Sequence, residues 1–468
     1  MPPTLEAIGL PLQSTCVTGS QTNLSWDVLL DMSGPGAQHE QLARALRNAI
    51  RDGVLRKGAT LPPSRKLAGD LQCSRWVVTQ AYAQLVAEGY LEARAGSATR
   101  VHCWADEVWK PVAPRATPPP PRYDLAPGLP DLRAFPRRRW ADAVRDALVT
   151  APHTDLGVPV AGGHPRLRTV LAEYLRRTRG AVTSDVLICS GVCQGVTLVG
   201  RALHAAGITR IAVEEPGWTR VWRAAEDAGL EVVPVRVDSS GLCVDRIPAG
   251  VRAVIVTPAH QFPSGVVLTP ERRAALLTWA RDVDGVILED DYDAEFRYDR
   301  KPVGTVQGMD PRRVVLLGSV SKTLSPALGI GWCVVPPQWT VPTAAPSVVD
   351  QLALATFVEK GWYHRYLRAA RLRYRARRDA LLDALGPLDV SGAAAGLHLL
   401  LHLDRPADEV VRRAASQGLK LVSLDAYRRT PGDPALVLGY GNLADSSVAD
   451  AVAVLKDSIG RSGSGRSR

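Results

Sequence analysis

This 468-residue sequence has no long apolar run, no cysteines at the spacing of metal ligands and only a few lysines. No apolar run approaches the roughly 18–20 residues that a membrane-spanning helix needs, so we expect no membrane partner. Residues 1–35 lack a basic start followed by an apolar stretch, which predicts no secretory signal and a cytoplasmic location. The seven cysteines do not have the spacing of metal ligands, so the sequence predicts reduced thiols and no metal site.

Arginine supplies most of the basic charge, because there are only eight lysines, at positions 57, 66, 110, 301, 322, 360, 420 and 456. The formal net charge of +10 suggests an anionic partner, although an arginine-rich composition also arises from coding bias. Apolar residues make up 46% and charged residues 22%, the balance of a soluble globular chain. The length predicts two or three domains of about 100–200 residues each.

Four consecutive prolines at 118–121 mark the clearest break in the chain. A proline run continues neither a helix nor a central strand, so residues 104–122 are predicted to be an extended linker. We expect an N-terminal arm over 1–37, a small domain over 38–103, a large domain over 123–459 and a disordered tail over 460–468. Residues 41–102 hold ten Lys/Arg against four Asp/Glu, which places most of the excess charge in the small domain.

The small domain reads as three helices followed by a hairpin. Apolar spacing predicts a helix over 41–51, and Ser64 and Ser74 stand where N-caps would open two more, over 64–71 and 75–88. The outer face of the third helix carries residues able to contact DNA: Arg75, Trp76, Thr79 and Gln80. Strands at 90–92 and 99–101 complete a helix-turn-helix with a wing, whose third helix fits a DNA major groove. A three-helix packing module with a solvated basic face is the alternative.

The segment 39–102 resembles the winged helix-turn-helix domain of the GntR family, almost without gaps. The matching pieces are AIRDGVLRKGATLPPSRKLA, the Ser74-Arg75 pair, AYAQLVAEGYLEA and the wing at 96–99. The resemblance implies that Arg65 and Arg75 are the leading contacts to double-stranded DNA, with Thr79 and the Gly96 wing on its backbone or minor groove. Ala98 replaces the second glycine of the family's wing.

After the linker, short apolar runs alternate with helix-like segments. The runs cover 186–190, 210–214, 253–257, 285–290 and 314–317. This alternation predicts an α/β domain with a mainly parallel sheet that is covered on both faces. In such a sheet, ligands bind at the carboxyl ends of the strands.

Three chemically active residues stand at two of these strand ends. Lys322 follows one run directly, and Asp290 and Tyr292 follow another in the segment EDDYD. Pyridoxal phosphate needs an amine, a carboxylate that keeps its pyridinium protonated and a donor to its phenolic oxygen, and a desolvated lysine keeps the neutral amine. An ordinary surface lysine and a metal-binding acidic loop are the alternatives, but no histidine or further acidic cluster accompanies EDDYD.

Together these residues resemble the fold-type I aminotransferases, and this resemblance runs from about residue 123 to 459. The order of the two domains resembles that of the MocR/GabR regulators. Matching segments include EEPGW, TPAHQFPSGVVLTPERR, EDDYDAEFRYD and GSVSKTLSPALGIGW. The resemblance implies that Lys322 forms a Schiff base, Asp290 pairs with the pyridine nitrogen and Tyr292 bonds the ring hydroxyl. It places Trp218 over the ring, His260 and Gln261 beside it, Ser190, Gly191, Val192 and Ser319 at the phosphate, and Arg220 at a substrate carboxylate.

Departures from the family pattern affect phosphate and substrate binding. Gly329 replaces an arginine that serves the phosphate, and Val158 replaces a tyrosine that reaches the neighbouring subunit's phosphate. Cys193 replaces a glutamine, and the family's arginine for the substrate α-carboxylate is missing before LGY at 438–440. Each charge-assisted phosphate bond contributes roughly 1.5–3 kcal/mol, so we expect weaker cofactor binding and no physiological transamination.

The leading hypothesis is a homodimeric, DNA-binding transcriptional regulator. Its aminotransferase-like domain would sense pyridoxal phosphate, or the adduct of this cofactor with an amine or amino acid, and shift the population of DNA-bound states. One alternative is an active aminotransferase with an accessory DNA-binding head. Another is a regulator whose aminotransferase fold has lost the cofactor and only dimerises or binds another ligand.

Overall fold

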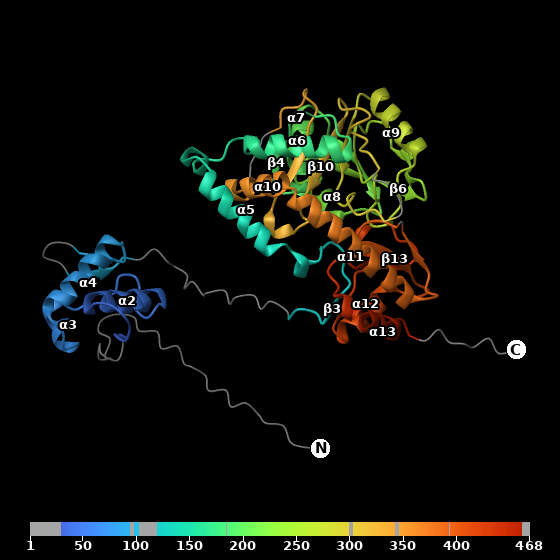
Figure 1. Ribbon diagram of the computed structural model, residues 1–468. Coiled ribbons are helices and arrows are strands. Elements are labelled where there is room, and N and C mark those ends of the chain that lie inside the picture. Colours follow the sequence, from blue (N-terminus) through green and yellow to red (C-terminus); the bar gives the residue numbers. More distant parts are fainter. Residues whose placement is uncertain are drawn as a thin grey trace, which may run out of the picture. The chain divides into compact units, whose positions relative to one another are not determined.

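The computed structural model describes residues 30–93, 98–102, 119–183, 185–298, 303–341, 346–392 and 394–460. The chain divides between Pro118 and Pro119 into two compact units (Figure 1). Each unit has its own hydrophobic core.

The described part of the small unit contains α2 (Gln38–Arg51), α3 (Ser64–Asp70), α4 (Arg75–Ala87), β1 (Leu91–Glu92) and β2 (Arg100–Val101). The two strands pair antiparallel, with Leu91 opposite Val101. Leu46 of α2, Leu67 of α3 and Leu85 of α4 are fully buried in one core. The predicted helix-turn-helix with a following hairpin is therefore confirmed, while Gly96 at the predicted wing tip lies outside the described residues.

Local residue chemistry sets the ends of α3 and α4. Ser74 caps α4, because its hydroxyl accepts from the backbone N–H of Val77 at 3.4 Å, and Gly89 follows the helix with φ +79°. The prediction that Ser64 caps α3 is wrong. Pro63 provides the extended backbone before the first turn and Ser64 is the first helical residue, so its hydroxyl is free to accept from Nε of Arg75 at 3.3 Å.

Eight strands form the central sheet of the large unit, in the order β4-β11-β10-β9-β8-β5-β6-β7. Their bounds are β4 (Leu187–Cys189), β5 (Arg210–Glu215), β6 (Glu231–Asp238), β7 (Gly241–Leu242), β8 (Ala253–Val256), β9 (Val286–Asp290), β10 (Val314–Ser319) and β11 (Gly331–Val334). β10, β9, β8, β5 and β6 are parallel, whereas β11 is antiparallel to both β10 and β4, and β7 is antiparallel to β6. The predicted, mainly parallel sheet is confirmed, and its five predicted strands are β4, β5, β8, β9 and β10.

Helices cover both faces of this sheet. Alternate residues of a strand point to opposite sides, so each strand packs against helices on both faces. Val315 and Leu317 of β10 pack in one cluster with α7 (Val192–Ala205) and α8 (Thr219–Glu226). Leu316 packs on the other face, in a cluster that includes α5 (Arg137–Thr150), α6 (Pro165–Arg179), α10 (Val348–Glu359) and α11 (Trp362–Leu385). Val314 packs there with α9 (Pro270–Asp282). Burial on both faces explains the continuous apolar runs of these strands.

A smaller antiparallel sheet lies in the C-terminal part: β12 (Val390–Ser391), β13 (His398–His402) and β15 (Ala435–Gly439), accompanied by α12 (Ala407–Ser416) and α13 (Val448–Ile459). β14 (Leu419–Lys420) pairs with β3 (Tyr123–Asp124), which joins the two ends of the large unit. Short 3-10 helices are η1 (Leu132–Ala134), η2 (His153–Leu156), η3 (Val244–Arg246), η4 (Pro326–Leu328), η5 (Leu424–Tyr427) and η6 (Asp445–Ser447). None of the helices in the described ranges is long and apolar enough to cross a membrane.

Candidate functional site

The outer face of α4 and the start of α3 present the side chains that the sequence predicts to contact DNA. Arg65, Arg75, Thr79 and Gln80 are exposed. Trp76 is 60% exposed and meets His39 of α2 edge to face, with ring centroids 5.3 Å apart. Ser74, also predicted to contact DNA, is exposed, and its hydroxyl accepts from Val77 as the cap of α4 while keeping its own hydrogen to donate.

In the large unit, Lys322 lies in the turn after β10 and its amine points into the interior. Its Nζ donates to the carbonyl oxygen of Gly128 at 2.6 Å and lies 5.6 Å from the ring centroid of Trp218. Burial lowers the pKa of the Lys322 ammonium, although the negative charges of Asp290 and Asp293 oppose that shift. The amine is therefore biased toward its neutral, nucleophilic form.

Asp290 ends β9, the strand next to β10, and is 3% exposed. Burial raises the pKa of its carboxyl well above the ordinary value, the charge of Asp291 adds to the shift, and the charge of Lys322 opposes it. Its Oδ1 has no hydrogen-bond partner among the described residues. A protonated pyridine nitrogen is a cationic donor that would satisfy this oxygen, so the residue fits the cofactor that the aminotransferase resemblance implies.

Trp218 and Arg220 stand at the start of α8, on the same side as Lys322. The Arg220 guanidinium carbon lies 5.8 Å from the ring centroid of Trp218. Arg220, Asp290 and Lys322 all act electrostatically on the thiol of Cys193, whose pKa is raised by burial. The structure thus brings together five residues from four separate segments of the sequence and gives the cluster an arginine able to meet an anionic group.

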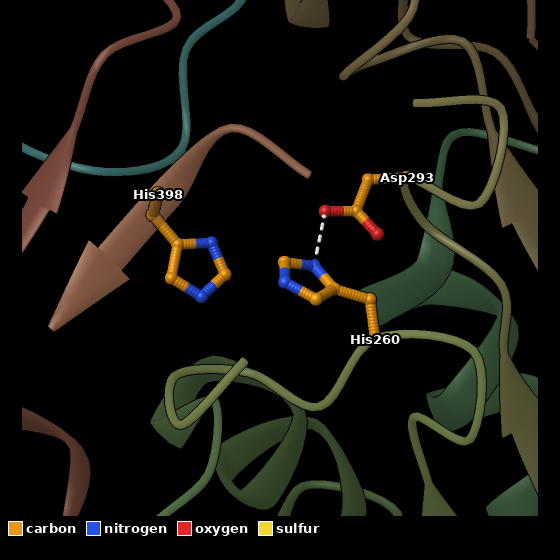
Figure 2. A group of neighbouring side chains, drawn as sticks. All are labelled: His260, Asp293 and His398. Atoms are coloured by element: carbon orange, nitrogen blue, oxygen red, sulfur yellow. Dashed lines mark hydrogen bonds and ion pairs between the residues drawn. The ribbon is translucent and has the colours of Figure 1, made fainter. Parts of the chain in front are cut away.

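The tyrosine side of the site contains a buried hydrogen-bonded group (Figure 2). Nδ1 of His260 lies 2.9 Å from Oδ2 of Asp293 and 3.1 Å from the hydroxyl of Tyr292. His398, the first residue of β13, lies against His260 with the ring centroids 4.9 Å apart and the planes tilted by 41°. Burial, followed by the charges of Asp293 and Asp290, holds the pKa of the Tyr292 hydroxyl well above its ordinary value, so the hydroxyl keeps its proton.

Gln261 does not have a free group to offer a ligand. Its amide nitrogen donates to Glu214 Oε2 at 3.2 Å, to the carbonyl oxygen of Pro216 at 2.9 Å and to that of Phe262 at 2.6 Å. Its amide oxygen accepts from both the backbone and the hydroxyl of Ser264. The side chain therefore holds the loops after β5 and β8 together.

The predicted phosphate contacts lie at the N-terminus of α7 and at the end of β10. Gly191 has φ +135°, a conformation that would be strained with a side chain. It precedes the 14-residue helix α7, and the first N–H groups of a helix can bind an anion. The Ser190 N–H already donates to Gln194 Oε1 at 2.6 Å, and the Ser319 hydroxyl accepts from the N–H of Ser321 at 3.3 Å. Val192 is the first residue of the helix.

The two positions with substituted phosphate ligands supply no polar side chain. Gly329 follows η4 with φ +56°, and a Cβ there would meet no atom within 4 Å. Val158 is 92% exposed. A cofactor phosphate would therefore depend on the helix N-terminus and on Ser319 among the predicted contacts.

Sequence reasoning missed Asp293, His398 and Gly128. Asp293 lies within the matched segment EDDYDAEF, three residues after Asp290, and this proximity was the available signal. His398 is a hundred residues further on and Gly128 contributes only a carbonyl oxygen, so no local pattern indicates either residue. The sequence predicts no metal site. The structure brings His260, Asp293 and His398 together, with one atom of the kind that binds metals from each within 4.8 Å of the others.

A helix-turn-helix unit joined to an aminotransferase-like unit defines a class of DNA-binding regulators. Residues 38–101 match the family of bacterial regulatory proteins of the gntR type, and residues 125–423 match aminotransferase class I and II. The chain therefore belongs to the MocR-type transcriptional regulators, in which a GntR helix-turn-helix is fused to an aminotransferase class I and II domain. Aminotransferase class I and II is a family of proteins that bind pyridoxal phosphate.

Relatives span almost the whole chain. The HTH-type pyridoxine biosynthesis transcriptional regulator PdxR of Corynebacterium glutamicum is 32% identical, over 92% of this chain and 98% of its own. The Rhizobium meliloti protein named "Probable rhizopine catabolism regulatory protein MocR" is also 32% identical, over 92% of this chain and 96% of its own. The kynurenine aminotransferase of Pyrococcus horikoshii has the same fold as the large unit, with a TM-score of 0.64 and 23% identity over 72% of this chain and 90% of the enzyme.

Proposed function

We propose that the aminotransferase-like unit of this regulator binds pyridoxal phosphate and that the bound cofactor, together with an amine or amino acid that reacts with it, is the regulatory signal. When bound, this cofactor supplies an aldehyde that condenses with primary amines. Lys322 would attach it, Asp290 would pair with its ring nitrogen, and Trp218 would cover its ring. Named relatives that control pyridoxine biosynthesis and rhizopine catabolism are consistent with such a signal.

The position of Lys322 carries the proposal. Its amine has a lowered pKa, lies over the Trp218 ring and is within electrostatic reach of the unpartnered carboxyl of Asp290. An amine, an aromatic face and an unsatisfied carboxyl at neighbouring strand ends are the arrangement that the cofactor requires. An isolated surface lysine would have none of these neighbours.

We further propose that the protein acts as a homodimer with two DNA-binding heads. The departures at the phosphate and substrate positions favour sensing over turnover: neither Gly329 nor the position before Leu438 provides an arginine. Arg220 remains available for the carboxylate of an amino acid or the acid group of another effector. Binding of the effector would then change the fraction of dimers whose two heads are placed to bind DNA.

The first test is the visible absorption of the full-length chain titrated with pyridoxal phosphate. We expect a new band in the wild type, its loss in Lys322→Ala, and its retention in Lys456→Ala, which removes an exposed lysine of α13. A band of equal strength in Lys322→Ala would contradict the proposed attachment. If the wild type shows no band, the proposal fails, and the alternative of an aminotransferase fold that no longer binds the cofactor is favoured. Sustained conversion of amino donors and keto acids would favour the enzyme alternative.

The second test concerns the DNA-binding head. Arg75→Ala is expected to weaken specific DNA binding roughly 10- to 100-fold, since one good contact to DNA contributes about 1–3 kcal/mol. The matched control is Arg47→Ala, which removes the same single charge from α2, where Arg47 is paired with Glu88 at 2.7 Å. Electrophoretic retention of a promoter fragment measures both variants. Equal losses in the two variants would refute the assignment of α4 as the recognition helix.

A further inference from the structure

The buried group of His260, Asp293 and His398 joins three separate elements (Figure 2). His260 lies in the loop after β8, Asp293 in the loop after β9 and His398 at the start of β13 in the C-terminal sheet. All three are at most 3% exposed. The backbone at Gly396 seals the group: a Cβ there would lie 2.1 Å from Cε1 of His260 and 2.5 Å from Oδ2 of Asp293.

Hydrogen-bond polarity fixes the proton on His398. Its Nε2 lies 3.2 Å from the carbonyl oxygen of Pro263, and a carbonyl only accepts, so Nε2 carries the hydrogen. Burial and the neighbouring His260 hold the pKa of His398 well below its ordinary value, so the ring is neutral. Its Nδ1 is therefore an acceptor.

The same reasoning fixes the proton on His260. A carboxylate also only accepts, so the 2.9 Å contact to Asp293 requires the hydrogen on Nδ1. The Tyr292 hydroxyl, 3.1 Å from the same Nδ1, then cannot donate to it and can only accept. This leaves the hydrogen of the Tyr292 hydroxyl for another acceptor, and the Asp293 side chain is itself within reach of this hydroxyl.

We propose that Asp293 is a positioning residue, which acts through Nδ1 of His260 to keep the Tyr292 hydroxyl a donor toward the ring oxygen of the bound cofactor; this role rests on the proposed function. Without the carboxylate, His260 can move its hydrogen to Nε2, and Tyr292 can donate to the bare Nδ1 instead. Asp293, Asp290 and Glu214 are the carboxylates whose charges act on the Tyr292 hydroxyl, while Lys322 and His398 are the basic groups nearby.

The test is the pH titration of the visible band of the full-length chain loaded with pyridoxal phosphate. A ring oxygen that loses its donor becomes more basic, so Asp293→Asn is expected to raise the pH midpoint by roughly one unit, the effect of one hydrogen bond to a charged group. Tyr292→Phe should give a similar rise. The double variant should show no further rise, because both changes remove the same bond. An unchanged midpoint in Asp293→Asn, or additive shifts in the double variant, would overturn the proposal.

A matched pair at His260 tests the same chain of bonds independently. The amide of His260→Asn can present a donor near the position of Nδ1, whereas that of His260→Gln reaches toward Nε2. We therefore expect the midpoint to move less in His260→Asn than in His260→Gln, and the reverse order would contradict the proton assignment. Thermal unfolding of the cofactor-free variants and their retention of DNA show whether each has folded.

Two further outcomes are distinguishable. If the wild type shows no band that depends on Lys322, the proposed function itself fails. If the purified wild type holds one divalent metal ion per chain and His398→Gln loses it, the group of His260, Asp293 and His398 is a metal site, and the positioning role proposed for Asp293 is wrong.

Discussion

Glu214 offers a sharp test of how the loops around the site are held. Its Oε2 accepts from the backbone N–H of Thr257 at 3.1 Å, from the Thr257 hydroxyl at 2.5 Å and from the Gln261 amide at 3.2 Å. Burial nevertheless raises the pKa of the Glu214 carboxyl from 4.5 to about 7. The folded chain therefore holds a proton that the unfolded chain has released, and stability falls as the pH rises from 4.5 to about 7.

The expected size follows from this gap in pKa. A gap of about 2.5 units corresponds to about 3.4 kcal/mol at 1.36 kcal/mol per unit. By linkage, the wild type has lost about 0.8 kcal/mol of stability at pH 5 and about 3.3 kcal/mol at pH 8, relative to low pH. Glu214→Gln keeps an oxygen for the three donors and removes the titration. Relative to the wild type, the variant should gain about 2.5 kcal/mol more at pH 8 than at pH 5, or roughly 3–4 °C in the melting temperature of the large unit.

Differential scanning calorimetry of the cofactor-free, full-length chain at the two pH values measures this difference. Glu289 and Glu295 also have pKa values raised to about 7, but their contributions cancel between variant and wild type. Glu271→Gln, at an exposed residue of α9, is the matched control and should change little at either pH. If Glu214→Gln has the same effect on the melting temperature at pH 5 and pH 8, the reasoning from burial is refuted.

Three further substitutions test the packing around the two units. Asp291→Asn should destabilise the large unit by about 3–5 kcal/mol, because it leaves the buried Arg179 guanidinium, now bonded at 2.7 and 2.8 Å, without its counter-charge; a denaturation midpoint equal to that of the wild type would contradict this. Gly331→Ala should lower cofactor affinity, since its Cβ would lie 2.6 Å from Cα of Gly191 at the start of α7; unchanged binding in the absorbance titration would count against the predicted phosphate contact. Leu46→Ala should destabilise the small unit by about 2–5 kcal/mol and leave the melting transition of the large unit in place, because Leu46 is fully buried in a separate core.

Local patterns predicted much of the fold because its elements follow from short-range rules. The apolar runs became β4, β5, β8, β9 and β10 within one or two residues at each end. The cap at Ser74 and the glycine at 89 bounded α4 as predicted. β11 was not predicted: it is a short strand that inserts antiparallel between β10 and β4, and its pairing is a long-range event that leaves no local signal. Ser64 shows a local rule overridden by the preceding proline.

The sequence by itself determined the two domains and the residues at the strand ends. It placed Lys322 and Asp290 at the carboxyl ends of two strands of a mainly parallel sheet, where ligands bind. The structure shows that these strands, β10 and β9, are neighbours. Only the tertiary structure decided which side chains remain available to a ligand. It committed every hydrogen bond of Gln261 to its own loops, left Asp290 Oδ1 unpartnered, and placed His398 against His260. These outcomes depend on atoms from distant segments meeting within hydrogen-bond reach, and chain order does not encode such distances in any local pattern.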